Sequence, residues 1–382
     1  MRSRIVRRRI IRLSIPLHML AFAVTGYVFS DSPLPDAESH RAEPSPVNEV
    51  ELLVNQIAPP NHFYYTQVIE PWGQSVSEVT GGRVKLRHTL ASMGSYRRNF
   101  DMAWAGIVDI AGGNQSATPG RFAVTQINES PNLASSRVEA LSVALWRTHR
   151  KYLHLADEFS GTHLLSLHTG GTHHWFTRDK PIRNLADIKG MKIAAPSDIG
   201  AKMLTAMGAI PVFLTAPEIH DGLSRGILDG VSLPATGVTR LGLTPYINYQ
   251  TRLANGAGLS FGGFFLTINA ASWARISSQD QKAILSISGE HFARRAAVVF
   301  DREMRQSEAD LYSSGVEVVV TDKGFDAELR RSTNFIDAQW IDNAQTAGVQ
   351  AQAALHYFHQ QVRKEAQTLA ASLRVNRPMP AQ

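Results

Sequence analysis

One stretch, residues 188–234, limits what this chain can fold into more than any other. It reads IKGMKIAAPSDIGAKMLTAMGAIPVFLTAPEIHDGLSRGILDGVSLP. Three short apolar runs, at 192–195, 211–214 and 228–233, alternate with two segments whose apolar residues recur at helical spacing. Ser197 stands before the first of these segments, where its side chain can cap a helix. Strands that alternate with helices predict a parallel sheet, and ligands of such sheets collect where the strands end.

Part of this pattern occurs twice in the chain. Residues 220–232, HDGLSRGILDGVS, repeat residues 100–112, FDMAWAGIVDIAG, in the form x-D-x-x-x-x-G-I-[VL]-D. The aspartates Asp101 and Asp221 lie 120 residues apart, and each copy aligns a helix end, a glycine and a following strand. Coincidence is the alternative, because a helix, a glycine and a strand often occur in series. We interpret the repeat as two α/β lobes of similar build around a shared cleft.

The first 30 residues have the composition of an export signal. Six arginines without an acidic residue precede a mostly apolar stretch, as in a secretory signal peptide, and the arginines at 7–9 also resemble a twin-arginine signal. We expect residues 1–30 to be a signal peptide and residues 31–47, rich in Pro, Ser and acidic residues, to be a tether. The expected location is periplasmic, or extracellular, and an uncleaved N-terminal anchor is the alternative.

The positive net charge of the chain belongs to this segment. The chain has 39 Lys and Arg against 33 Asp and Glu, a net charge of +6, and six of the arginines lie in the first 30 residues. The remaining chain is balanced, which gives no support to a nucleic acid partner, since such partners need a basic face. The sequence contains no cysteine, which excludes disulfides, thiol catalysis and thiolate metal sites.

Several short segments, taken in their order and spacing, resemble the periplasmic solute-binding subunits of tripartite ATP-independent periplasmic (TRAP) transporters of the dicarboxylate-binding type. These segments are Thr80–Lys85, Ala105–Asp109, Pro119–Phe122, Lys180–Ile182, Asp187–Ile193, Met207–Pro211, Gly226–Gly230, and Ile268–Asn269 followed by Trp273. The resemblance implies a bilobal α/β fold like that of periplasmic binding proteins, in which strands and a long helix join two lobes and a ligand cleft lies between them. It also implies a small-molecule ligand, a TRAP membrane permease as partner, no catalytic residue, no cofactor and no bound metal.

The order of strands and helices divides the chain beyond the tether into these two lobes. Lobe I is expected to comprise residues 48–170, with about 260–300 returning to it. Lobe II is expected to comprise residues 171–259, with about 301–372 completing it. Glycine pairs mark both crossings between the lobes, and we expect the protein to be a monomer.

Ala194 is the position at which the chain departs from the family pattern. After the segment that ends at Ile193, the family usually has an arginine whose guanidinium pairs with the carboxylate of the ligand. A buried carboxylate without such a partner is disfavoured, so we expect an atypical ligand and a less cationic, more aromatic pocket. Possible substitute anchors are Arg97, Arg98, Arg178 and Arg240, each of which can instead be a solvated surface residue.

Eight residues are candidate ligand contacts: Phe63, Tyr64, Asn114, Gln115, His174, Trp175, Ala194 and Ser232. The resemblance places His174 where relatives have a polar or basic contact, and a histidine can donate a hydrogen bond or, when protonated, supply charge. Trp175 can stack on an apolar ligand or pack in the core. Asn114 and Gln115 follow a strand, as polar site residues do, although a surface loop is the alternative. Phe63 and Tyr64 begin the first helix, where ordinary packing is the alternative for Phe63.

Two other function classes remain open at this point. A dense run of histidines, with His163 and His168 ahead of His173 and His174, suggests a metal site, but it lacks the i, i+4 spacing of helical zinc ligands, so we expect none. An enzyme would need a nucleophile elbow or a paired carboxylate motif, and we find neither. A ligand-binding module of a membrane sensor differs from a transport protein only in its partner, and neighbouring genes for permease subunits would favour transport.

Overall fold

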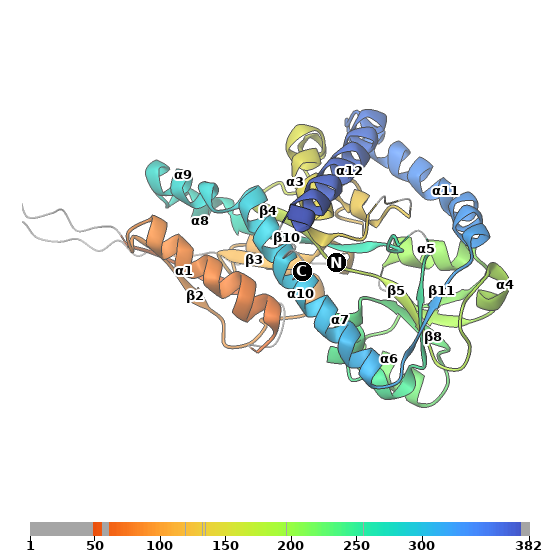
Figure 1. Ribbon diagram of the computed structural model, residues 1–382. Coiled ribbons are helices and arrows are strands. Elements are labelled where there is room, and N and C mark those ends of the chain that lie inside the picture. Colours follow the sequence, from red (N-terminus) through yellow and green to blue (C-terminus); the bar gives the residue numbers. More distant parts are fainter. Residues whose placement is uncertain are drawn as a thin grey trace, which may run out of the picture. The chain divides into compact units, whose positions relative to one another are not determined.

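Two separate β-sheets organise the part of the chain that the computed structural model describes (Figure 1). The described residues are 49–375 without 56–60, 119, 132, 134, 196 and 255. The expected signal peptide and tether lie outside these residues. Residues from Val47 onward form one compact unit. The prediction of a bilobal α/β fold is confirmed, since each sheet has its own helices and its own core.

The sheet of lobe I has the strand order β2-β1-β3-β10-β4. Its strands are β1 (Val50–Asn55), β2 (Val84–His88), β3 (Ile110–Asn114), β4 (Thr162–Thr172) and β10 (Phe261–Asn269). The first three run parallel, and β10 lies antiparallel between β3 and β4. Helices of this lobe are α1 (Glu70–Val79), α2 (Asn99–Trp104), α3 (Val138–Lys151), α8 (Ala270–Ala274) and α9 (Ser278–Ser286).

The sheet of lobe II has the strand order β11-β9-β5-β8-β6-β7. Its strands are β5 (His174–Thr177), β6 (Lys192–Ala194), β7 (Ile210–Val212), β8 (Gly230–Leu233), β9 (Tyr249–Arg252) and β11 (Glu317–Val320). Only β5 runs antiparallel to its neighbours. Its helices are α4 (Leu185–Ile188), α5 (Asp198–Ala206), α6 (Ala216–Ser224) and α7 (Ala235–Arg240). The predicted alternation over residues 188–234 is confirmed as β6, α5, β7, α6 and β8, and Ser197 caps α5 by accepting a hydrogen bond from the Gly200 N–H.

The two copies of the sequence repeat have the same local structure. In each copy a helix, α2 or α6, ends at a glycine with positive φ, +70° at Gly106 and +69° at Gly226. The aspartate that follows accepts a backbone N–H of the neighbouring parallel strand at 2.7 Å: Asp109 from Leu53 and Asp229 from Lys192. The repeat therefore marks equivalent helix-to-strand connections in the two lobes.

Several segments of the described chain connect the lobes. The chain passes from β4 to β5 at His173, and it returns from β9 to β10 at Ser260, where the His173 N–H donates to the Ser260 carbonyl at 2.9 Å. The crossing thus falls slightly beyond the glycine pair that the sequence suggested. A further connection is the long helix α10, residues Gly289–Ser313 (Figure 1). Its Phe300 packs in the core of lobe I and its Leu311 packs in the core of lobe II.

The C-terminal helices differ from the expectation in two places. The apolar spacing of residues 277–312 predicts one long helix, but the structure has two, α9 and α10, which are separated at Gly289, whose φ is +58°. Helix α11 (Lys323–Thr346) packs on α5 of lobe II, whereas α12 (Ala351–Val375) packs on α3 of lobe I. The reason is the apolar stripe of α12, which includes Phe358 and Val362 and enters the core of lobe I.

Short helical turns connect the main elements. They are the π-helical turn η1 (Tyr65–Ile69) and the 3₁₀ turns η2 (Tyr96–Arg98), η3 (Gln115–Ala117), η4 (Thr125–Glu129), η5 (Leu153–Ala156) and η6 (Thr244–Tyr246). Over the described ranges, none of the helices has both the length and the apolar composition of a membrane span.

Candidate ligand-binding site between the lobes

The strand ends of the two sheets meet across the interface of the lobes. Ser197, directly after β6, donates a hydrogen bond to Glu129 at the end of η4 in lobe I, with an oxygen–oxygen distance of 2.5 Å. Pro234, directly after β8, packs close to Gly171 of β4. A Cβ atom added to Gly171 would lie 3.2 Å from the Cβ atom of Pro234. The carboxyl ends of β6 and β8 therefore face lobe I, as a ligand site between the lobes requires.

Strand register separates the candidate residues of lobe II into two groups. In the pairing of β5 with β8, His174 lies opposite Leu233 and Trp175 lies opposite Ser232. Because paired residues share a face and successive residues alternate, Trp175 and Ser232 point to the other face from His174. Ala194 is paired with Val231, two residues before Leu233, and so shares the face of His174. Of these four candidates, His174 and Ala194 thus share one face of the sheet.

Trp175 lies in the core of lobe II, which is the alternative that the sequence left open. It is 1% exposed, and its ring meets that of Phe325 in α11 edge to face at 5.9 Å. Ala194 is also buried, among Phe176, Leu223 and Val231.

The substitute arginines considered above do not reach Ala194. Arg178 donates to the Leu223 carbonyl and pairs with Asp179, and Arg240 pairs with Glu303 at 2.7 Å. Arg97 and Arg98 are exposed in η2 of lobe I.

His174 lines a cavity of about 430 Å³ to which both lobes contribute. Lobe I supplies Arg137, ahead of α3, and Thr172 at the end of β4, while lobe II supplies Arg252 at the end of β9. The Thr172 hydroxyl and the Nε atoms of both arginines are buried and lack hydrogen-bond partners among the described residues. A hydroxyl and two guanidinium N–H groups are donors, so this hinge cavity is suited to a ligand with acceptor oxygens.

The charge of the hinge cavity comes from its arginines and not from His174. Burial, and secondly Arg252, lowers the pKa of His174 to about 3, so the ring is neutral at neutral pH. Of the two roles left open for His174, a neutral ring can fill only that of a hydrogen-bonding group. Two carboxyl groups also line the cavity: Glu308 pairs with Arg252 at 2.7 Å, and Asp301 has its pKa raised by burial, against the influence of Arg137.

Phe63 and Tyr64 belong to an aromatic cluster that we define as Phe63, Tyr64, His168, Phe264 and Phe300. The ring of Tyr64 lies 5.6–5.7 Å from those of His168, Phe264 and Phe300, and Phe63 meets Phe300 edge to face at 5.2 Å. From lobe II, the Arg240 guanidinium lies 4.7 Å from the centre of the Phe63 ring. Burial lowers the pKa of His168 to about 3, and both of its ring nitrogens lack partners among the described residues. The aromatic cluster therefore extends from the sheet of lobe I to the lobe interface.

Asn114 and Gln115 lie at the carboxyl end of β3, as predicted, but have different roles. The Asn114 side chain accepts the Ser116 N–H at 2.9 Å and so caps η3. Gln115 is fully buried rather than part of a surface loop, and its amide lacks partners among the described residues. It packs so closely over Gly263 that a Cβ atom there would lie 1.9 Å from its Oε1 atom.

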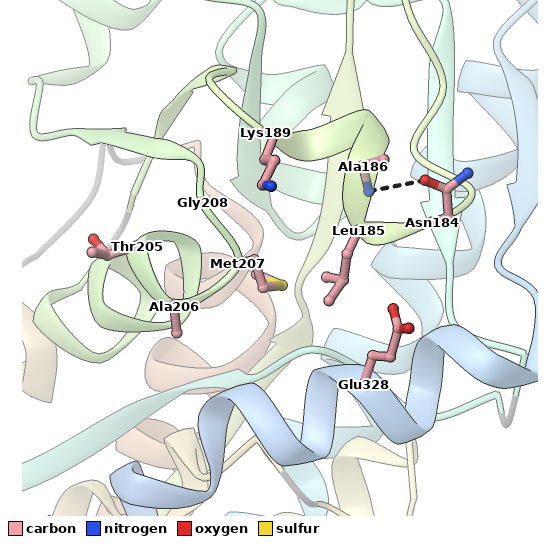
Figure 2. A pocket seen from close by; sticks show the side chains of 9 residues that line it. All are labelled: Asn184, Leu185, Ala186, Lys189, Thr205, Ala206, Met207, Gly208 and Glu328. Atoms are coloured by element: carbon pink, nitrogen blue, oxygen red, sulfur yellow. Dashed lines mark hydrogen bonds between the residues drawn. The ribbon is translucent and has the colours of Figure 1, made fainter.

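Another hollow lies on lobe II away from these candidates (Figure 2). It has a volume of about 630 Å³ and lies between α4, the end of α5 and α11. Figure 2 shows the Asn184 side chain turned toward the Ala186 N–H, from which it accepts a hydrogen bond as the cap of α4. None of the eight candidate residues lines this hollow. Within the described ranges, no group of three or more His, Asp or Glu side chains is placed to hold a metal ion.

Arg137 and Arg252 are the residues of the hinge cavity that the sequence did not reveal. Both lie in segments outside the family-like pieces, and the partner strand of β9 is β5, which comes much earlier in the chain. Neither arginine carries a local sequence signal that marks it as a site residue.

Comparison with known proteins identifies the family. Residues 54–336 match the DctP model, described as bacterial extracellular solute-binding protein, family 7. A TRAP periplasmic solute-binding protein from Bordetella bronchiseptica, solved with bound (R)- and (S)-mandelate, is 31% identical, with a TM-score of 0.77 over 82% of this chain and 99% of that one. A TRAP solute-binding protein from Rhodoferax ferrireducens, solved with copurified benzoate, is 26% identical, with a TM-score of 0.76 over 84% of this chain and 99% of that one.

A curated relative extends the same similarity. The outer membrane transporter protein TsaT of Comamonas testosteroni is 27% identical over 312 residues, which are 81% of this chain and 91% of that protein. Proteins of the matched family are non-catalytic receptors, so this protein is not an enzyme. The resemblance that the sequence motifs suggested is confirmed: the chain belongs to the DctP family, the periplasmic solute-binding proteins of TRAP transporters.

Proposed function

We propose that this protein captures a small aromatic carboxylate in the hinge cavity and delivers it to the membrane permease of a TRAP transporter. The observation that carries the proposal is a set of buried donor atoms without partners among the described residues around this cavity: the Thr172 hydroxyl and the Nε atoms of Arg137 and Arg252. Buried polar groups are almost always hydrogen-bonded, so a cavity lined by unsatisfied donors favours a ligand with acceptor oxygens. A carboxylate provides two such oxygens and the negative charge that guanidinium groups favour.

The size of the cavity and the nature of its surroundings support an aromatic ligand. A volume of about 430 Å³ suits a small molecule of the size of benzoate or mandelate. The aromatic cluster approaches from the lobe I side, because Phe300 lies one helical turn before Met304 of the cavity on α10. Similar proteins were solved with mandelate and with benzoate, which are aromatic carboxylates.

We further propose that Arg252 and Arg137 replace the arginine that is missing at Ala194. The family position lies on β6, whereas Arg252 lies on β9, next to β5 and His174. The neutral His174 ring then orients the ligand through one hydrogen bond and adds no charge. The ligand carboxylate is thus held by an arginine on a different strand from the one that carries the family arginine in relatives.

A thermal-shift screen with ligands of one shape and different charge tests the function. Benzoate, benzamide and benzylamine share the ring and present a negative, a neutral and a positive group. We expect benzoate and mandelate to raise the melting temperature with increasing concentration, since a ligand at 100 times its Kd stabilises by about 2.7 kcal/mol. Stabilisation by benzylamine or benzamide and not by the acids would contradict the proposed ligand class.

Delivery to a permease is tested separately. Vesicles that contain a TRAP permease from the same genome should take up labelled ligand only when the protein is added. Uptake that is equally fast without the protein would exclude a transport role and would leave the sensor module as the function.

A further inference from the structure

The hydrogen bond between Glu129 and Ser197 is a direct contact between the lobes. Glu129 ends η4, whose Val124 and Ile127 are part of the lobe I core. Ser197 caps α5 at the carboxyl end of β6 in lobe II. Their side-chain oxygens lie 2.5 Å apart, and the residues are only 2% and 7% exposed. Separation of the lobes at this edge would break the bond and return both groups to water.

The geometry fixes which group donates. The Ser197 hydroxyl accepts the Gly200 N–H at 3.0 Å as the N-cap of α5. Its proton is therefore free to point at Oε2 of Glu129, which accepts it. The other carboxyl oxygen of Glu129 is buried and has no partner among the described residues. A charged carboxylate in this position is only half satisfied, whereas a protonated carboxyl group has much less to lose on burial.

We propose that Glu129 and Ser197 form a latch that holds the lobes closed over the solute, and that closure at this contact is favoured when Glu129 carries a proton. Both are positioning residues, since the proposal places them outside the hinge cavity. The inference rests on the proposed capture of a solute between the lobes. Lobe closure can nevertheless be measured without a ligand, so the two ideas can fail separately.

The titration of Glu129 supports the geometric argument. Burial raises the pKa of Glu129 to about 7 in the closed structure, the Ser197 hydrogen bond opposes this, and Asp198 adds to it. Other acids at this edge serve neighbouring groups: Glu158 accepts the backbone N–H groups of Val124 and Thr125, and Asp337 of α11 bonds to Ser130. In open lobes the exposed carboxyl group would titrate near about 4.3. Closure therefore takes up a proton, is favoured at low pH, and weakens as the pH rises through about 7.

Because the chain has no cysteine, dyes can be attached at two engineered cysteines without interference. Gln74→Cys on α1 and Arg225→Cys after α6 place them on exposed sites of the two lobes. Energy transfer between the dyes then reports the ratio of closed to open molecules at pH 5.5 and pH 8. We expect this ratio to fall about tenfold or more from pH 5.5 to pH 8 in the otherwise unchanged protein.

Variants separate the latch from general stability. Glu129→Gln keeps an acceptor but cannot titrate, so its closed fraction should not depend on pH. Ser197→Ala should open the lobes at both pH values, and Ser197→Thr, which keeps the hydroxyl, should restore closure. Ser277→Ala removes the N-cap of α9, which lies in lobe I away from the interface, and controls for cap loss. An unchanged pH dependence in Glu129→Gln, or equal effects of Ser197→Ala and Ser277→Ala, would overturn the latch. If the unchanged protein closes with the expected pH dependence but binds no organic acid, the proposed function is overturned and the latch is not.

Discussion

Arg252 lies on the strand next to His174 and has a buried Nε without a partner among the described residues. If it holds the ligand carboxylate, Arg252→Gln should weaken benzoate binding by about tenfold to 100-fold, since a hydrogen bond to a charged group contributes about 1.5–3 kcal/mol. Titration calorimetry measures the affinity. The matched control is Arg225→Gln, on an exposed arginine after α6. Equal affinities of both variants and of the unchanged protein would show that Arg252 does not contact the ligand.

Ala194 permits the converse experiment. Ala194→Arg restores the residue that the family usually has, on the face of His174. We expect it to increase the affinity for benzoate by about tenfold and to leave benzamide binding unchanged, because a new guanidinium favours only the charged ligand. Ala194 is buried, so Ala194→Met controls for the added volume. A folded Ala194→Arg protein with an unchanged preference between benzoate and benzamide would contradict the idea of a missing anchor.

Residues of the site could be predicted from the sequence only where local pattern decides their direction. His174 and Ala194 fall on one face through the pairing of β5 and β6 with β8, and their contact with a ligand stays a prediction. Leu233 is the residue of β8 that shares the face of His174, and the candidate Ser232 lies one residue before it. In a strand, a shift of one residue places the side chain on the opposite face. Arg252 depends on the pairing of β5 with β9, which joins segments that are far apart in the sequence.

Gly289 separates α9 from α10 and shows how distant packing decides a local structure. Its φ of +58° disfavours any side chain, and a Cβ atom there would lie 2.7 Å from the Trp146 ring of α3. Gly348 also has a positive φ, +79°, but no atom lies within 4 Å of its Cβ position. We expect Gly348→Ala to cost about 1–2 kcal/mol for the backbone alone and Gly289→Ala to cost a further 1–3 kcal/mol for overpacking. Urea unfolding checks this, and equal losses in the two variants would contradict the role of Trp146.

The elements that the sequence predicted well are those with local signals. The alternation from β6 to β8 carries its own caps, its glycines and its apolar spacing, and each of these points to the same structure. The break at Gly289 was missed because a glycine within a helical pattern is often tolerated. The docking of α12 on lobe I was missed because an apolar stripe predicts burial and does not specify the surface that buries it.

At the scale of the whole molecule, the contacts between the lobes surround the candidate site with groups that titrate. On one side the hinge strands carry His173 and His174, and on another the Glu129–Ser197 latch joins η4 to α5. Burial lowers the pKa of both histidines and raises that of Glu129. Protonation of Glu129 is therefore expected to favour closure at the latch, whereas protonation of the histidines weakens the fold around the hinge.

The buried histidines make the folded protein sensitive to acid. Burial lowers the pKa of His168 and His174 to about 3 and that of His173 to about 4, against about 6.5 in the unfolded chain. Between pH 6.5 and these values the unfolded chain binds more protons, so stability is full above pH 6.5 and falls as the pH drops. Each of the three histidines should reduce the free energy of unfolding by about 2 kcal/mol between neutral pH and pH 5.

His168→Phe isolates one of these contributions. The ring of His168 lies among Tyr64, Phe264, Phe292 and Phe300, so phenylalanine fits its surroundings and removes the titration. We expect urea unfolding of this variant to show a loss between pH 7.5 and pH 5 that is smaller by about 2 kcal/mol than in the unchanged protein. His220→Phe, on the solvent side of α6, should retain the full loss. Protonation of Glu129 stabilises the folded protein over the same pH range. A net decrease in the free energy of unfolding on acidification would therefore mean that the buried histidines outweigh Glu129. A flat stability from pH 7.5 to pH 5, or an equal loss in His168→Phe, would show that the buried rings do not control the response to acid.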